Sequence, residues 1–267
     1  MDMENFNYHR PATVNAAAAL LKKSKGGSYM AGGHTLLPTM KQGLASPTDI
    51  IDLTAIKGFS GITVTKSAVV IKAGTTHMEV ASSAAVKKAI PALAEMAGKI
   101  GGVHVRHKGT IGGSVANSDP AADYPSACVG LGATIVTNKR KIPADAFFTG
   151  MFQTVLKDGE IITGVSFPVP KKSSHMKFPN PASRYSLVGV FLAQGADGKV
   201  RVAVTGAGPK VFRVPEMEAA LSKSFAVSAL AGIAAKAKGL NADMHATAEY
   251  RAHLIGVLAR RAVEAAK

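Results

Sequence analysis

Two short glycine loops contain the residue types that hold phosphate groups. Residues 31–35 read Ala-Gly-Gly-His-Thr, and residues 109–114 read Gly-Thr-Ile-Gly-Gly-Ser. Glycine lets backbone N–H groups approach a phosphate without a Cβ in the way, and the start of a following helix adds partial positive charge. Hydroxyl and imidazole side chains in the loops supply further donors. Each loop alone is a weak signal, because two adjacent glycines more often make an ordinary turn.

Together the two loops predict a ligand with two phosphates that is gripped from both sides. FAD and the nicotinamide dinucleotides are ligands of that kind. The sequence has no strand–GxGxxG–helix unit followed by an acidic residue roughly 20 positions later, so a Rossmann site is disfavoured. A Walker A loop is also absent. Asp123, which follows the second loop, is either an acceptor for a ribityl or ribose hydroxyl or a solvated acid in a first helical turn.

Capping residues and hydrophobic periodicity predict the elements around the loops. Before the first loop, a helix capped by Thr13 is expected over 11–25 and a strand over 28–31. After that loop we expect a helical turn over 35–41 and a strand over 50–53. Towards the second loop, short antiparallel strands are predicted over 57–76 and helices over 78–90 and 91–100. After it, a helix over 119–131 is expected, with Asp119 as its cap and Pro120 in its first turn.

The second half of the chain contains a segment that we interpret as a domain boundary. Strands are predicted over 133–137 and 160–167, and residues 171–181 are rich in Pro, Ser and Lys, as in a linker. Paired strands over 185–193 and 199–206 are joined at Asp197-Gly198, a hairpin signal. Two alanine-rich helices follow over 216–240 and 247–266. The predicted domains are residues 1–56, 57–172 and 173–267.

The composition describes a basic globular protein with a single thiol. The 267 residues suffice for one large domain or two to three small ones. A net charge of +15 attracts polyanions, but the cations are scattered and not interleaved with aromatics, which favours solvated faces and a docking surface over nucleic-acid binding. Cys128 is the only cysteine, which excludes disulfides and cysteine-ligated iron–sulfur or zinc sites within this chain. We expect Cys128 to be a small core residue.

Neither the N-terminus nor any internal segment of the sequence indicates a signal peptide or a transmembrane segment. Residues 1–10 contain acids and no apolar stretch, which argues against a signal peptide. No segment is long and apolar enough to span a membrane, so a cytoplasmic protein without a transmembrane segment is expected. The basic cluster 104–108 contains a His-x-x-His pair without a third metal ligand. It is expected to attract phosphates or an acidic neighbour.

The extended context of both loops resembles the FAD-binding medium subunits of molybdenum hydroxylases, which include aerobic carbon-monoxide dehydrogenase, nicotine dehydrogenase and the flavin domain of xanthine dehydrogenase. Residues 31–41, with Pro47 and 51–53, are similar to the first flavin loop of that family, and residues 110–125 to the second. Residues 161–165 and 177–190 are similar to its later signatures. The resemblance covers nearly the whole chain, in order.

The resemblance implies an α+β protein. Its FAD-binding fold would be of the vanillyl-alcohol oxidase (PCMH) type in two α/β subdomains, followed by a C-terminal domain with a three-stranded antiparallel sheet and helices. The two loops would hold the pyrophosphate, with Tyr185 near the isoalloxazine ring. Pro181 and Arg184 stand where many relatives have a basic and then an acidic residue. The cofactor-binding residues predicted in this way are Ala31, Gly32, Gly33, His34, Thr35, Leu36, Thr110, Ile111, Gly112, Gly113, Ser114, Asn117, Asp119, Asp123, Ile162, Lys177 and Tyr185.

The same resemblance implies an electron-transfer subunit with no catalytic side chain of its own. FAD would be bound non-covalently, with His34 as a phosphate-side donor or loop-shaping residue. The resemblance places molybdopterin and two-iron two-sulfur clusters on partner chains, and the single cysteine of this chain could not ligate such a cluster. The partners would be an iron–sulfur small subunit and a molybdopterin large subunit in a dimer of heterotrimers, a heterohexamer. Oxygen, a quinone, a cytochrome and a nicotinamide remain open as the external acceptor.

Two other functions remain open at this stage. One is a stand-alone FAD-dependent oxidoreductase with its own substrate pocket. It would need an acid or base above the flavin, and no strong candidate is visible in the sequence. The other is a basic binding module that holds no flavin.

Overall fold

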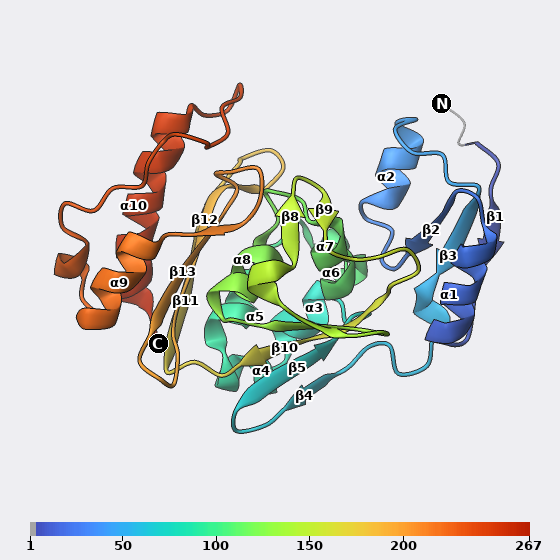
Figure 1. Cartoon of the computed structure of the whole chain (residues 1–267), viewed down its shortest axis with the longest axis horizontal. Coiled ribbons are helices and arrows are strands. Elements are labelled where there is room, and N and C mark those ends of the chain that lie inside the picture. The colour runs from blue at the N-terminus through green and yellow to red at the C-terminus, as the bar shows by residue number, and fades with distance from the viewer. Residues whose placement is uncertain (1–3) are drawn as a thin grey trace.

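The computed structural model describes residues 4–267. Residues 1–3, the start of the predicted first domain and of the segment inspected for a signal peptide, lie outside the described residues. Three main sheets with their helices follow one another across the molecule, from the N-terminal sheet to the C-terminal sheet (Figure 1). This mixture of helices and largely separate sheets confirms the predicted α+β class. No helix within the described range combines the length and the apolar character needed to cross a membrane.

The N-terminal sheet is parallel, with strand order β1-β3-β2. Helix α1 begins after Thr13 as predicted, because the Thr13 hydroxyl accepts a hydrogen bond from the N–H of Ala16 at 3.1 Å. Strand β1 was not predicted, since three residues are too few to show an alternating pattern. The elements in order are β1 (Asn7–His9), α1 (Val14–Lys23), β2 (Gly27–Met30), α2 (Leu36–Lys41), β3 (Asp49–Asp52) and the 3-10 helix η1 (Leu53–Ala55).

The central sheet is antiparallel, with strand order β4-β5-β10-β6-β7, and helices pack against it around the largest apolar core. Cys128 is fully buried in that core, which confirms its predicted role. The strands are β4 (Ile62–Val64), β5 (Ala68–Lys72), β6 (Thr134–Thr137), β7 (Lys141–Pro143) and β10 (Ile162–Pro168), with a small hairpin of β8 (Phe148–Gly150) and β9 (Gln153–Thr154). The helices are α3 (His77–Ser82), α4 (Ala84–Ala89), α5 (Pro91–Gly98), α6 (Val103–Lys108), α7 (Ile111–Asn117), α8 (Asp123–Gly130) and the 3-10 helix η2 (Ala144–Ala146).

Local polar contacts correct two predictions in this region. The helix expected over 78–90 is split, because Ser83 is extended and caps α4 by accepting from the N–H of Val86. The helix expected from Asp119 begins only at Asp123, since Asp119 instead accepts the N–H of Ala121 at 2.8 Å in a turn. Residues 103–108, for which no element was predicted, form α6.

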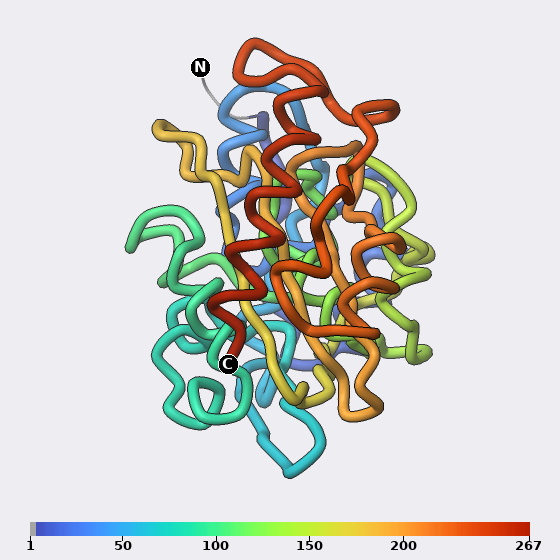
Figure 2. The backbone as a smooth tube through the Cα atoms, turned by 90° about the vertical axis from the view of Figure 1, so that its left-hand side faces the viewer, coloured from blue at the N-terminus to red at the C-terminus, as the bar shows by residue number. Residues whose placement is uncertain are grey.

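The C-terminal sheet has strand order β11-β12-β13-β14 and is antiparallel. Its three long strands match the predicted sheet, and the two-residue β14 adds a fourth at the edge. Helix α10 lies across one face of the sheet (Figures 1 and 2), while α8 packs on β12 and β13. The elements are β11 (Lys172–Pro179), β12 (Ser186–Gln194), β13 (Val200–Thr205), β14 (Phe212–Arg213), α9 (Pro215–Lys223), the 3-10 helix η3 (Val227–Leu230) and α10 (Ala248–Ala265).

Two predictions about this half of the chain are wrong. Residues 171–181 are not a linker, because β11 pairs with β12 along nearly its whole length. The strand was missed because Ser173, Ser174 and His175 are polar and yet buried. The helix expected over 216–240 ends at Lys223, and the following segment contains Gly232 and Gly239 with φ of +74° and +86°, which no right-handed helix accepts.

Candidate functional site

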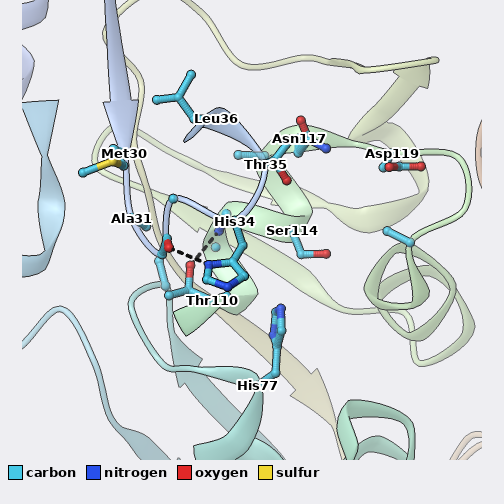
Figure 3. A pocket seen from close by; sticks show the side chains of 18 of the residues that line it. Met30, Ala31, His34, Thr35, Leu36, His77, Thr110, Ser114, Asn117 and Asp119 are labelled. Carbon is cyan, nitrogen blue, oxygen red and sulfur yellow. Dashed lines mark hydrogen bonds between the residues drawn. The ribbon is translucent and has the colours of Figure 1, made fainter. Parts of the chain in front are cut away.

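The two glycine loops meet on one cavity of about 630 Å³. The loop after β2 forms one wall and the segment from Gly109 to Asn117 forms the facing wall (Figure 3). The start of β10 and the β11–β12 turn contribute further parts of the wall. Every residue predicted to bind a cofactor lines this cavity except Ile111, whose side chain is buried in the central core. Residues far apart in sequence are therefore brought to one place.

The two loops touch through their glycines. A Cβ on Gly32 would lie 1.9 Å from the carbonyl oxygen of Lys108, so only glycine allows the first loop to approach the second. Gly112 is restricted in the same way, because a Cβ there would lie 2.5 Å from the Cβ of Ala73. Gly33 has a φ of +70° and turns the chain from β2 into α2. These three glycines are required by the fold itself.

Gly113 is different, since packing within the chain does not require a glycine there. A Cβ on Gly113 would meet only the hydroxyl oxygen of Thr110, at 3.1 Å. Gly113 also borders the cavity. Helices α2 and α7 have only six and seven residues, so their dipoles are weaker than the sequence suggested. A phosphate here would depend on close approach to the loop backbone and side chains, which an open Gly113 permits.

Asp123 does not present a free carboxylate to the cavity. Its Oδ1 accepts a hydrogen bond from Ser186 at 2.6 Å, and its Oδ2 accepts one from Lys177 Nζ at 2.7 Å. Lys177 also donates to the carbonyl of Lys99 at 3.3 Å. His175 lies nearby, with Nε2 at 3.8 Å from Asp123, and burial lowers the pKa of His175 to about 4. The buried acid therefore positions Lys177, rather than being a solvated acid of a helical turn.

The comparisons with known proteins agree with this geometry. Residues 4–170 match the family model described as the FAD binding domain in molybdopterin dehydrogenase. Residues 180–266 match the CO dehydrogenase flavoprotein C-terminal domain. The chain belongs to this family of FAD-binding medium subunits. It is thus the flavoprotein subunit of an oxidoreductase.

Two relatives are similar to this medium subunit over nearly their full length. The nicotine 6-hydroxylase medium subunit of Paenarthrobacter nicotinovorans is 34% identical, with 98% of each chain covered. The carbon monoxide dehydrogenase medium chain of Hydrogenophaga pseudoflava is 32% identical, with 98% of this chain and 96% of that chain covered. A solved carbon monoxide dehydrogenase structure from the same organism superposes with a TM-score of 0.87 at 30% identity, covering 99% and 98%. The fold and the cofactor class are therefore shared.

The walls of the cavity in this medium subunit fit FAD. Besides the two loops, they include apolar and aromatic side chains that sequence reasoning missed, among them Tyr29, Leu53, Phe59 and Leu156. Tyr29 directly precedes the first loop and could have been found from its position. The other three come from segments without a motif, and only the fold brings them to the site. Apolar walls with a few polar groups are typical of cofactor sites.

His34 belongs to the first loop and lies at the centre of the site (Figure 3). Its Nδ1 lies 3.0 Å from the carbonyl oxygen of Gly32, which is a contact within its own loop. Tyr185 is about half-exposed at the edge of the cavity. Of the two residues that depart from the family pattern, Arg184 lines the cavity and Pro181 does not. Arg184 has a φ of +62°, an uncommon conformation for a residue other than glycine.

Glu160 is a second buried acid that the sequence did not single out. Arg140 donates to both of its oxygens, from Nε at 2.9 Å and Nη2 at 3.0 Å, and Thr137 donates at 2.7 Å. The hydrogen bonds from Arg140 lower the pKa of Glu160 to about 2. Glu160 is therefore an ionised anchor that fixes the start of β10, where Ile161 and Ile162 face the cavity. Its proton is not available for acid–base chemistry near neutral pH.

Proposed function

We propose that this medium subunit binds FAD non-covalently between its two glycine loops and carries electrons from iron–sulfur clusters of a partner subunit to an external acceptor. FAD supplies the one- and two-electron chemistry, and the protein supplies binding and orientation. The observation that supports this proposal most directly is that both loops line the same cavity. A cofactor with two phosphates can bridge loops that face each other from separate sheets.

The roles proposed for individual residues follow from their places on the walls. The backbone of residues 31–35 and 110–114 would hold the pyrophosphate. Lys177, held by Asp123 at 2.7 Å, would direct a positive charge towards the isoalloxazine end, beside Tyr185. Asn117, Asp119 and Ile162 also border the cavity and would contact the cofactor. No side chain is required to act as an acid or base on an organic substrate.

The partners of the proposed complex are an iron–sulfur small subunit and a molybdopterin large subunit, assembled as a dimer of heterotrimers in the cytoplasm. The single buried cysteine supports this division of labour, because this chain cannot ligate a cluster through cysteine. The net charge of +15 supports docking onto more acidic sister subunits. Co-purification of the three chains, followed by mass measurement of the intact assembly, tests the proposed composition.

One experiment distinguishes the proposed electron-transfer subunit from a stand-alone oxidoreductase. The FAD-loaded chain and the reassembled complex are each mixed anaerobically with candidate substrates. Reduction of the flavin is followed as bleaching of its visible absorbance. We expect bleaching only in the complex. Substrate-dependent bleaching of the isolated chain would instead show that it has a substrate pocket of its own. A chain that takes up no FAD in either state would favour the basic binding module.

A further inference from the structure

His77 is a buried histidine on the floor of the cavity that no motif points to. It is the first residue of α3, its exposed fraction is 5%, and it borders the cavity. Figure 3 shows its ring directed towards His34, Thr110 and Ser114. Its Nδ1 is enclosed and has no hydrogen-bond partner within residues 4–267. A buried polar side chain that faces a ligand cavity in this way needs an explanation.

The ring of His77 is held against the second glycine loop. A Cβ on Gly109 would lie 2.6 Å from Nε2 of His77, so the ring rests on the backbone of the residue that precedes Thr110. The backbone N–H of His77 donates to the carbonyl of Gly109 at 2.9 Å. The ring of Tyr124 lies against the other side, with the centroids 5.4 Å apart. Nε2 is therefore the nitrogen nearest the loop.

The surroundings of His77 keep it neutral. Burial lowers its pKa to about 4, with further lowering by His34 and Arg106, while Asp123 opposes the shift. These groups face the ring from the first loop, α6 and α8, and α8 also places the titratable side chain of Tyr124 against it. A proton added to the enclosed Nδ1 would also have no acceptor within the described part of the chain. A neutral imidazole has one N–H to donate, and only Nε2 is placed to donate it towards the loop.

We propose that His77 is a phosphate-side binding residue whose Nε2–H donates a hydrogen bond to the pyrophosphate of the bound dinucleotide. This inference rests on the proposed FAD function of the same cavity. It makes His77 a third contact beside the two loops, and one that acts without positive charge. A purely structural histidine would pack against Tyr124 and Gly109 and would not affect the cofactor.

Three substitutions of His77 in the full chain distinguish a phosphate-binding role from a purely structural one. His77→Gln places an amide N–H near the position of Nε2, His77→Asn places one near Nδ1, and His77→Phe keeps the ring without a donor. FAD affinity is measured by quenching of flavin fluorescence, with the chain alone or in its complex, whichever retains the cofactor. We expect FAD to bind about 10- to 100-fold more weakly to the Phe and Asn variants, the effect of one charge-assisted hydrogen bond, and within about threefold of wild type to the Gln variant. Equal affinity of the Phe variant and wild type would overturn the proposal.

The control is His253→Gln, because His253 is exposed on α10 and does not border the cavity. Thermal melting of each variant without FAD shows whether a loss of affinity is a loss of folding. Phosphorus NMR of bound FAD provides a second readout, since replacing the donor should shift the pyrophosphate resonances in His77→Phe and not in His253→Gln. Unchanged resonances in His77→Phe would contradict the inference. A wild-type chain that binds no FAD would instead contradict the proposed function.

The neutral state of His77 has its own test. Between pH 6 and 8, the ratio of the FAD affinities of wild type and His77→Gln should stay constant, because the ring does not titrate there. A ratio that grows as the pH falls would show that His77 binds the cofactor as a cation, which would overturn this part of the proposal.

Discussion

Lys177 Nζ lies 2.7 Å from Asp123 Oδ2, and both side chains are at least 95% buried. The pair joins α8, which packs against the central helices, to β11 of the C-terminal sheet. Asp123 is fixed further by Ser186 of β12. The C-terminal sheet therefore supplies the amine that faces the cavity, while the segment after the second glycine loop supplies the acid that holds it. The same ion pair therefore lies at the contact between these two parts and on the wall of the cavity.

Breaking this pair should affect stability and cofactor binding together. Asp123→Asn leaves the buried ammonium of Lys177 without its counter-ion, so we expect a loss of about 3–5 kcal/mol in the free energy of unfolding. Urea denaturation of Asp123→Asn, Lys177→Met and the double variant measures the coupling. The double variant should be more stable than the sum of the single losses predicts. Additive losses would show that the two side chains do not interact.

Replacing Gly113 should weaken FAD binding without unfolding the chain. Gly113→Ala places a methyl group at the cavity wall, where it meets only the hydroxyl of Thr110 within the protein. We expect a melting temperature within a few degrees of wild type, because alanine favours the helix by roughly 0.5–1 kcal/mol over glycine. FAD affinity should fall at least tenfold.

Two further glycines serve as controls for that experiment. Gly102→Ala should change neither property, since a Cβ there meets no atom within 4 Å. Gly32→Ala should destabilise the chain even without FAD, because of the collision with the carbonyl of Lys108. An unchanged FAD affinity in Gly113→Ala would show that FAD does not bind close to the second loop.

His175 should make stability depend on pH below neutrality. Its pKa falls from the ordinary value of 6.5 to about 4 in the folded chain because the ring is buried. Below pH 6.5 the unfolded chain binds more protons than the folded one, so stability decreases as the pH falls from 6.5 towards 4. His175→Phe should reduce this decrease, by on the order of 2 kcal/mol at pH 5. Thermal melting of both chains between pH 4.5 and 7.5 checks this, and parallel curves would refute it.

Some of the fold could be predicted because local physical signals agree with the tertiary structure. Thr13 caps α1 in the structure as its position predicts, and the Asp197-Gly198 turn joins β12 to β13. The first glycine loop lies where β2 meets α2, as its sequence indicates, whereas the second lies between α6 and α7, with Gly112 and Gly113 in the first turn of α7. In these cases the residues that set the local conformation also lie next to the element that they define.

Other features could not be predicted because the deciding contacts are distant in sequence. Strand β11 was hidden by Ser173, Ser174 and His175, which are buried by a strand and a helix that follow later in the chain. Asp123 was interpreted either as an acceptor for a ribityl or ribose hydroxyl or as a solvated helical acid, because its actual partners are 54 and 63 residues away in the sequence. His77 has no motif, and only the docking of residues 109–114 onto residues 73–77 brings it to the cavity.

The central claim is that this chain holds one FAD non-covalently between its two glycine loops. The most direct measurement is a titration of the full chain with FAD, alone and together with its partner chains, followed by precipitation with trichloroacetic acid. We predict saturation at one FAD per chain, with the yellow flavin recovered in the acid supernatant. Failure to retain FAD in both states would contradict the account, and a precipitate that stays yellow would contradict non-covalent binding.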